Sequence, residues 1–501
     1  MIFRNGGFLS CPDADLVVVK GDRIAAVGRE EAISEEFLPD DEIVDLDGGL
    51  LLPGFIDSHV HIFGTGLAEM GWRIDLTGMT REETCAVLAA RVEERGAGEW
   101  VLAGGWDESQ WPDRRHLGRR ELDRFSPRSP VGAVRMDGHL LVVNSEGLRI
   151  ARELFLDDTL EELIDAERGE IREQAAWKML ASLEPDSSTL AEAFAAAARL
   201  CHRCGVTSVH TMTAQDRIAV LLNAKDRNRL RVTTYHKVAG VEEIADVRET
   251  DAFDGTWARF GGVKAFADGS FGAGNAAVRE PYVDGGAGVL NHTDASLEAI
   301  LRRCEAAGWQ TAIHAIGDRA IEQVLRVHAV VGSSHELRHR IEHFELPTGD
   351  QIERVKRLGL LLSMQPNFIG NWSGSGSMYE RKLGGARDRN SNPLRRVLDA
   401  EVPLAFGSDG MPLAPIYGMA SAVNAAYESQ RVTVDEALAC YTERGSWFSS
   451  EEGVQGRLEV GALADLVIID EDPRAAPDQL AERRIRRVYV GGECVYVSEE
   501  I

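Results

Sequence analysis

Long apolar runs are absent from this 501-residue sequence, and so are low-complexity segments and short internal repeats. No run approaches the roughly 20 apolar residues that a membrane-spanning helix needs. The first 24 residues alternate between apolar and polar types as a strand does, and they contain no apolar core typical of a signal peptide. The sequence therefore predicts a protein without membrane contact, and a cytoplasmic location is expected.

Cysteine and positive charge are both scarce. Seven cysteines, an odd number, are scattered along the chain, which is not the pattern of a disulfide framework. The pair Cys201 and Cys204 lies in a helical segment with no second pair nearby, so neither structural zinc nor redox chemistry is expected there. The 81 Asp and Glu outnumber the 55 Lys and Arg, for a net charge of −26. Such a surface repels phosphate backbones, so the expected partner is a small molecule and not nucleic acid.

Apolar runs alternate with helical runs from about residue 205 onward. This βαβα rhythm indicates a parallel sheet. Because the rhythm is long and polar residues stand at the strand ends, it favours a closed barrel over an open sheet. The predicted fold class is therefore α/β, with a TIM-like (β/α)8 barrel at its centre.

The two ends of the chain share a texture of short strands broken by glycines. We predict that residues 1–52 and 455–501 form one composite β-sandwich domain, and that 53–454 form the barrel, because domain termini often lie close in space. The rhythm is interrupted at about 62–200, just after the first barrel strand. Loops at that face commonly carry specificity, so this insertion is expected to cover the barrel mouth.

Metal-ligand residue types recur at the ends of the predicted barrel strands. His59 and His61 are two positions apart on one strand, so both side chains point to the same face. Four later apolar runs carry Lys264, His314, His343 and Asp409. Any one of these is more often a satisfied core polar group. Strand ends converge in a barrel, however, and buried polar groups are costly unless paired or metal-bound, so the set predicts a metal centre.

Ten segments in this order resemble the amidohydrolase superfamily and, within it, the amidohydrolase-3 group of YtcJ-like proteins. They are GGLLLPGFIDSHVH, GGWDESQWPDRR, MDGHLLVVNS, GVKAFADGSFG, PYVDGGAG, IHAIGDRAI, RIEHFELP, SMQPNF, FGSDGMP and GRLEVGALADLVIIDEDP. The resemblance covers nearly the whole chain, and the combined order is specific where no single segment is. It implies a metal-dependent hydrolase that cleaves a non-peptide, amide-type C–N bond with metal-activated water, and it implies a homodimer.

The resemblance also implies roles for the six residues of the predicted centre. His59 and His61 match ligands of the more buried metal, His314 and His343 match ligands of a second metal, and Asp409 matches the residue that binds metal and moves protons. Lys264 matches a lysine that is often carboxylated and bridges both metals. A bare ammonium has no acceptor, whereas a carbamate offers anionic oxygens. An uncarboxylated Lys264 leaves a mononuclear centre as the alternative, with its ammonium paired to Asp409 or another acid. One or two divalent ions are expected, with zinc as the default for nitrogen and carboxylate ligands.

Further residues are candidates for the substrate pocket. The resemblance places His139 there, able to polarise a carbonyl, although a structural histidine fits equally. Trp106 and Asp107 are expected to reach the pocket from the insertion, whereas aromatic residues such as Trp106 and Trp111 are more often packing. His210 ends an apolar run and either faces the site or packs in the core.

Two segments depart from the family pattern. Ala273-Gly274-Asn275 stands where Ser-Arg-Thr is frequent, so a substrate-contacting arginine is absent, and Gly410-Met411 stands where an aromatic is frequent. Because both changes fall near the expected pocket, the substrate of known relatives does not carry over to this chain, whereas the metal chemistry does. The same metal centre also suits esters, lactones or cyclic amidines. A non-catalytic barrel scaffold usually lacks metal ligands, whereas all six positions are filled here.

Overall fold

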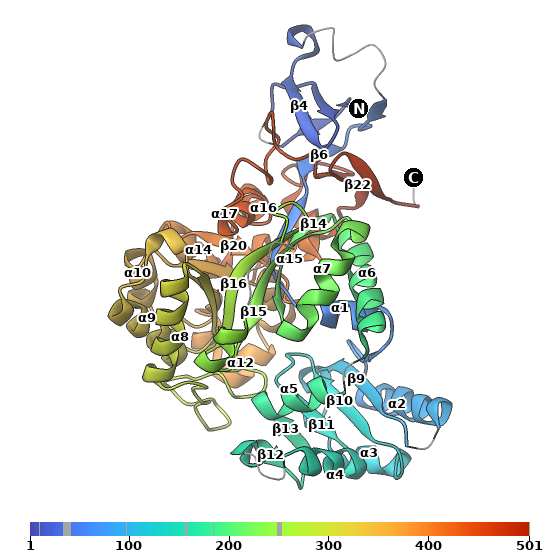
Figure 1. Cartoon of the computed structure of the whole chain (residues 1–501), viewed down its shortest axis with the longest axis vertical. Helices are drawn as coiled ribbons and strands as arrows, with labels where there is room; N and C mark the ends of the chain where they lie inside the picture. Colours follow the sequence, from blue (N-terminus) through green and yellow to red (C-terminus); the bar gives the residue numbers. More distant parts are fainter. Residues whose placement is uncertain are drawn as a thin grey trace.

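Eight parallel strands form the central sheet of the computed structural model, which describes residues 1–9, 11–33, 42–96, 98–155, 159–183, 185–247 and 253–499 (Figure 1). In chain order they are β7 (Phe55–Val60), β14 (Val206–Thr213), β15 (Arg231–Lys237), β16 (Ala258–Phe266), β17 (Gln310–Ala315), β18 (Arg340–His343), β19 (Leu361–Met364) and β20 (Leu404–Phe406). The first and last strands approach each other, as shown by the hydrogen bond that the Asp409 amide donates to the His59 carbonyl at 2.7 Å. The predicted TIM-like barrel is confirmed.

The barrel strands are apolar because helices cover their outer face. Between successive strands lie α8 (Asp294–Ala307), α9 (Asp318–Val331) and α10 (Gly349–Arg357), which Figure 1 shows side by side against the barrel. The ends of α8 show why it forms there: the Thr293 side chain caps its first turn, and Gly308 ends it with a φ of 71°. No helix in the described ranges is long and apolar enough to cross a membrane.

Two small sheets contain the strands from both chain termini, and Figure 1 shows both termini on the same side of the molecule. One has the order β4-β3-β1-β5, and the other has the order β2-β6-β21-β22-β23. Their strands are β1 (Ile2–Arg4), β2 (Gly7–Phe8), β3 (Leu16–Lys20), β4 (Arg23–Gly28), β5 (Ile43–Asp45), β6 (Leu50–Pro53), β21 (Leu466–Ile469), β22 (Ile485–Val490) and β23 (Glu493–Val497). The rings of Phe3 and Tyr489 meet edge to face at 5.2 Å and join the two sheets. Strands from both termini thus share one sheet, while the boundaries at 52 and 455 remain a prediction.

The segment after the first barrel strand contains a third sheet, with the order β12-β13-β11-β10-β9-β8. Its strands are β8 (Ile74–Asp75), β9 (Val101–Trp106), β10 (Val131–Arg135), β11 (Leu140–Val143), β12 (Ile164–Asp165) and β13 (Glu170–Arg172), and its helices are α2 (Arg81–Arg95), α3 (Arg119–Phe125), α4 (Ser145–Leu154) and α5 (Glu173–Ser182). On either side of it in the chain, α1 (Ile62–Glu69) and α6 (Ser187–Arg203) pack together beside β14. The inserted sheet has apolar cores of its own, and Figure 1 shows it at the far side of the barrel from the termini.

Candidate metal centre and pocket

Three predicted ligands meet where the first and last barrel strands end. His61 Nε2 lies 3.2 Å from Asp409 Oδ1, and His59 Nε2 lies 3.6 Å from the same oxygen. One ligand atom of each residue falls within 4.8 Å of the others, a spacing that can hold a metal ion. Asp409 adopts a φ of 56°, in the left-handed region, and Gly410 follows it with a φ of 77°. The chain therefore turns sharply at the residue whose carboxylate faces the histidines.

The other three predicted residues lie beside this group. The rings of His314 and His343 are 4.5 Å apart, and those of His59 and His343 are 4.8 Å apart. Lys264 is fully buried on β16, and its charge acts on His59 and on Asp409. The structure thus brings all six residues to the carboxyl-terminal end of the barrel.

Several buried atoms of this cluster have no hydrogen-bond partner among the described residues. They are His59 Nε2, Lys264 Nζ, His343 Nδ1 and Asp409 Oδ1, the last of which has only the ion-pair contacts of His61 and His59 given above. A buried polar atom without a partner carries a desolvation penalty of about 1–3 kcal/mol. Four such atoms in one cluster, all of them nitrogen or carboxylate oxygen, fit a divalent metal such as Zn²⁺.

His59 is held from behind by a buried ion pair. Its Nδ1 bonds to the Glu342 carboxylate, which in turn accepts from Arg340. The guanidinium of Arg340 donates to Glu342 twice, to the Ser58 carbonyl, to His210 and to the Tyr235 hydroxyl. A carboxylate on the far nitrogen fixes the orientation of an imidazole, so His59 presents Nε2 to the cluster. His210 belongs to this support and does not line the pocket.

Burial and charge set the protonation of the cluster. Burial lowers the pKa values of His59, His314 and His343 well below their ordinary value, so these imidazoles are neutral. Burial also lowers the pKa of Lys264 to about 7. Burial opposes ionisation of Asp409, but His59, His61 and Lys264 lower its pKa overall. The site therefore offers neutral nitrogens and one carboxylate, the protonation states that bind metal.

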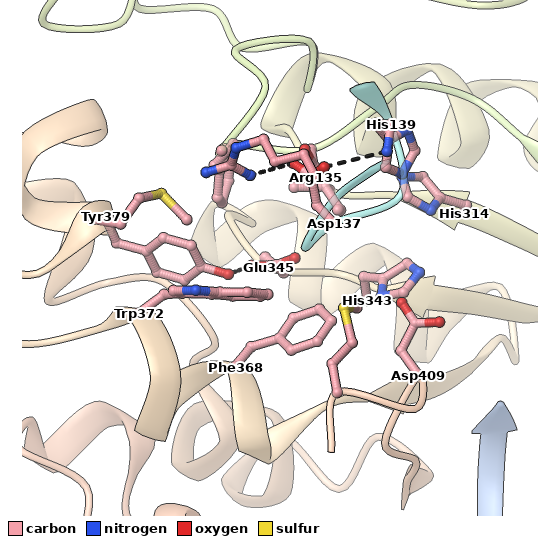
Figure 2. A pocket seen from close by; sticks show the side chains of 16 residues that line it. Arg135, Asp137, His139, His314, His343, Glu345, Phe368, Trp372, Tyr379 and Asp409 are labelled. Carbon is pink, nitrogen blue, oxygen red and sulfur yellow. Dashed lines mark hydrogen bonds and ion pairs between the residues drawn. The ribbon is translucent and has the colours of Figure 1, made fainter. Parts of the chain in front are cut away.

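A small cavity opens next to the cluster. Its apolar wall consists of Phe271, Ile316, Phe368, Trp372, Met378, Tyr379 and Met411. Figure 2 shows Phe368, Trp372 and Tyr379 on one side of this space, and His314, His343 and Asp409 on the other. Apolar walls beside a few polar groups are typical of small-molecule sites, so this space suits the apolar part of a small ligand.

The insertion supplies His139 to this cavity (Figure 2). The His139 ring lies 5.5 Å from that of His314, and its Nδ1 is 2.9 Å from Glu173. Although burial opposes protonation, Glu173 and then Asp137 raise the pKa of His139 to about 9. The insertion therefore places a protonated imidazole over the metal-type cluster, which is the group formed by His59, His61, Lys264, His314, His343 and Asp409.

The structure does not bring Trp106 to the cavity. Its indole N–H donates to the Ala133 carbonyl at 3.0 Å, and its ring stacks on Trp111 in the core of the inserted sheet. The predicted pocket role of Trp106 is wrong, because the aromatic pair fills that core. Asp107 lies behind the cavity wall, where it accepts from the Trp372 indole at 3.3 Å.

Three ionisable residues that line the cavity, Arg135, Asp137 and Glu345, were not predicted. Arg135 is buried against Glu108 at 2.9 and 3.0 Å and against Asp137 at 2.6 Å. Glu345 accepts from the Tyr379 hydroxyl, and burial raises the pKa of Glu345 to about 8. Each of these residues stands in or beside an apolar run, as the predicted ligands do, and that was the available signal. Of the two departures from the family pattern, Gly274 has a φ of 71°, and Met411 contributes to the cavity wall.

Comparison with known proteins places this geometry in a family. The model described as the amidohydrolase family matches residues 42–496. YtcJ of Bacillus subtilis (strain 168) is 29% identical over 96% of each chain, and the N-substituted formamide deformylase of Arthrobacter pascens is 26% identical over 97% of this chain and 95% of its own. An uncharacterized metal-dependent hydrolase from Pyrococcus horikoshii OT3 is similar in structure, with a TM-score of 0.75, 25% identity, and coverage of 95% of this chain and 98% of its own. This chain is a metal-dependent hydrolase of carbon–nitrogen bonds and belongs to the amidohydrolase family.

Proposed function

We propose that the chain hydrolyses a small non-peptide amide, with an apolar part of the substrate in the cavity and the scissile carbonyl at the metal-type cluster. The observation that carries this proposal is the set of orphaned buried atoms of His59, Lys264, His343 and Asp409 beside an aromatic wall. The relative named N-substituted formamide deformylase supports an N-substituted amide as the substrate class.

One or two zinc ions are the cofactor in this proposal. His59, His61 and Asp409 would hold one ion, and His314 and His343 would hold a second. With its pKa at about 7, Lys264 is a neutral amine in a large share of molecules. A neutral amine can add CO₂ with the release of one proton, and the resulting carbamate would offer anionic oxygens to the metal. When bound, zinc would lower the pKa of a ligated water to about 7 and would polarise a carbonyl.

The protein residues position the substrate and move its protons. Asp409 takes a proton from the attacking water and delivers it to the leaving nitrogen, which is a poor leaving group unless protonated. His139 has Nδ1 engaged by Glu173, so its other ring nitrogen is left to donate to the substrate carbonyl oxygen. A fixed cationic donor near the developing negative charge favours the transition state.

Metal analysis beside kinetics tests this assignment. Asp409→Asn should keep metal, with weaker affinity, and lose about 10²–10⁴ in amide turnover because the proton relay is gone. His59→Ala should lower metal content and activity together. An Asp409→Asn enzyme with full turnover on an amide would contradict the mechanism even though the fold stands.

A paired substrate screen separates amide from ester chemistry. Metal-loaded enzyme is assayed with N-formyl and N-acyl amines and with esters of the same acyl groups. We expect amide hydrolysis, and we expect Asp409→Asn to reduce it more than ester hydrolysis, because an alkoxide leaves more readily than an amine. Ester hydrolysis without any amide hydrolysis would reject the proposal.

A further inference from the structure

A buried acid, Glu345, stands in the wall of the cavity beside the metal-type cluster. Glu345 lines the cavity and is only 2% exposed. It follows the end of β18 by two residues, and the chain turns sharply between them, because His343 and Phe344 have φ angles of 73° and 50°. The charge of Asp409 acts on Glu345, so the carboxyl lies within electrostatic reach of the cluster.

Only one oxygen of this carboxyl is held by the protein. Oε2 accepts from the Tyr379 hydroxyl, the bond drawn in Figure 2, and from the Asn392 side-chain amide at 3.5 Å. Among the residues that the structure describes, Oε1 has no hydrogen-bond partner and the carboxyl has no salt bridge. A buried acceptor without a partner is costly, so Oε1 is the atom that a ligand in the cavity would satisfy.

Aromatic rings connect the cluster to Glu345. The ring of Phe368 lies nearly parallel to that of His343, with 6.0 Å between their centres. The Phe368 and Trp372 rings are 4.8 Å apart, and the Trp372 and Tyr379 rings are 6.2 Å apart. Tyr379 then bonds Glu345. A ligand that extends from the cluster to this carboxyl therefore passes along aromatic faces, which attract cations as well as apolar groups.

The positive charges of the cavity wall are already engaged elsewhere. Two carboxylates hold Arg135, and Glu173 holds His139 at 2.9 Å. Neither cation forms a salt bridge with Glu345. Burial raises the pKa of Glu345 to about 8, and a cation placed against its carboxyl would favour the ionised form. The unmatched charge of the wall is therefore acidic, and the group that complements it is a cation.

We infer that the N-substituent of the substrate ends in an ammonium group, which donates to Glu345 Oε1 and lies against the rings of Trp372 and Tyr379; this inference rests on the proposed function. A hydroxyl group could donate to the same oxygen, but it would gain nothing from the aromatic faces. An ammonium group satisfies both the carboxyl and the rings. The substrate class is therefore an N-acyl diamine, with its carbon chain along the aromatic wall.

Two sulfonamides, which resist the hydrolysis that amides undergo, test the inference. The mono-methanesulfonamide of diaminobutane and the methanesulfonamide of pentylamine have the same length and differ in ending in an ammonium or a methyl group. Titration calorimetry on the metal-loaded protein should show the ammonium compound binding at least about tenfold tighter, as one hydrogen bond to a charged group supplies. Glu345→Gln should bring this ratio close to one, because glutamine keeps the size and the bond to Tyr379 but not the charge. It should leave the dissociation constant of the pentylamine compound unchanged.

The matched control is Glu353→Gln, which removes an exposed carboxylate on the outer helix α10 and should keep the wild-type ratio. Where Glu345→Gln fails to fold, a crystal structure of the wild-type complex decides the matter, since the ammonium nitrogen should lie about 3 Å from Glu345 Oε1. Equal affinities in the wild type, a preference that survives Glu345→Gln, an ammonium group bound elsewhere, or no binding of either compound would overturn the inference. Equally tight binding of the corresponding terminal alcohol would overturn it as well.

Turnover of the corresponding N-formyl and N-acetyl amides separates this inference from the proposed function. An ammonium preference in binding, without turnover of any of these amides, would reject the proposed amide hydrolysis and leave the ammonium site standing. Turnover of the amides without an ammonium preference would overturn the inference and leave the proposed hydrolysis standing.

Discussion

Glu342 joins the barrel interior to the metal-type cluster through its bond to His59. We expect Glu342→Gln to weaken metal binding by about 10- to 100-fold, because an amide holds the imidazole less firmly than a carboxylate and leaves Arg340 without its counter-charge. Competition with a chromophoric chelator measures the affinity. Glu305→Gln is the matched control, since Glu305 bonds His339 at 2.9 Å, a histidine that is not part of the cluster. Unchanged affinity in Glu342→Gln would show that this bond is only structural.

His139 should make stability depend on pH. Its folded pKa of about 9 exceeds the ordinary value of 6.5. A raised pKa favours the folded state fully below about pH 6.5, and the benefit is lost as the pH rises through about 9. The shift corresponds to about 3 kcal/mol. Unfolding free energies of wild type and His139→Gln, measured from about pH 6 to 10, should therefore converge toward high pH. A difference that stays constant with pH would mean that His139 is not protonated in the fold.

Individual residues differed in how far the sequence revealed them. His59, His61 and Asp409 could be predicted because ligand-type side chains at the ends of apolar strands are rare as core residues. Glu342 directly precedes His343 and was not predicted, because its partner Arg340 lies two positions away on the same strand and its second partner, His59, is far away in the chain. A pairing across the barrel has no local signal.

At the scale of elements, the insertion contacts the barrel where β10 ends, through the packing of Arg135 against Gly272. Arg135 sits against Gly272, where an added Cβ would lie 2.1 Å from its Nη1. We expect Gly272→Ala to destabilise the fold by about 1–3 kcal/mol, because overpacking forces the ion pairs of Arg135 apart. Chemical unfolding measures this cost. Gly104→Ala on β9 is the control, since its nearest atoms would be at 3.7 and 3.8 Å. Equal costs for the two variants would reject a tight contact between these elements.

The barrel strands were readable from the sequence and the inserted sheet was not. Buried parallel strands give continuous apolar runs separated by helices, a rhythm visible over two hundred residues. The inserted sheet combines a parallel pair, β9 and β10, with an antiparallel pair, β10 and β11, and several of its strands are only two or three residues long. Without a recognised sheet there was no core to which Trp106 could be assigned.

In the whole molecule, a buried ion pair between Arg231 and Asp465 attaches the terminal sheets to the barrel. Arg231 is the first residue of β15, and its guanidinium binds both oxygens of Asp465, at 2.5 and 2.9 Å. Asp465 directly precedes β21, and it also accepts from the Gly491 amide at 2.8 Å. One buried carboxylate therefore ties the amino-terminal end of the barrel to two segments of the five-stranded terminal sheet.

Asp465→Asn should therefore loosen the terminal sheet from the barrel. The substitution leaves a buried guanidinium without its counter-charge, and breaking a buried ion pair in this way typically costs about 3–5 kcal/mol. Glu298→Gln is the control, because its pair with Arg302 on the exposed face of α8 should contribute less than about 1 kcal/mol. Calorimetry of the variant also tests whether residues 1–52 and 455–501 act as one domain. We expect both terminal segments to melt early and together, with hydrogen exchange as the measurement. Separate melting of the two segments would contradict the composite domain.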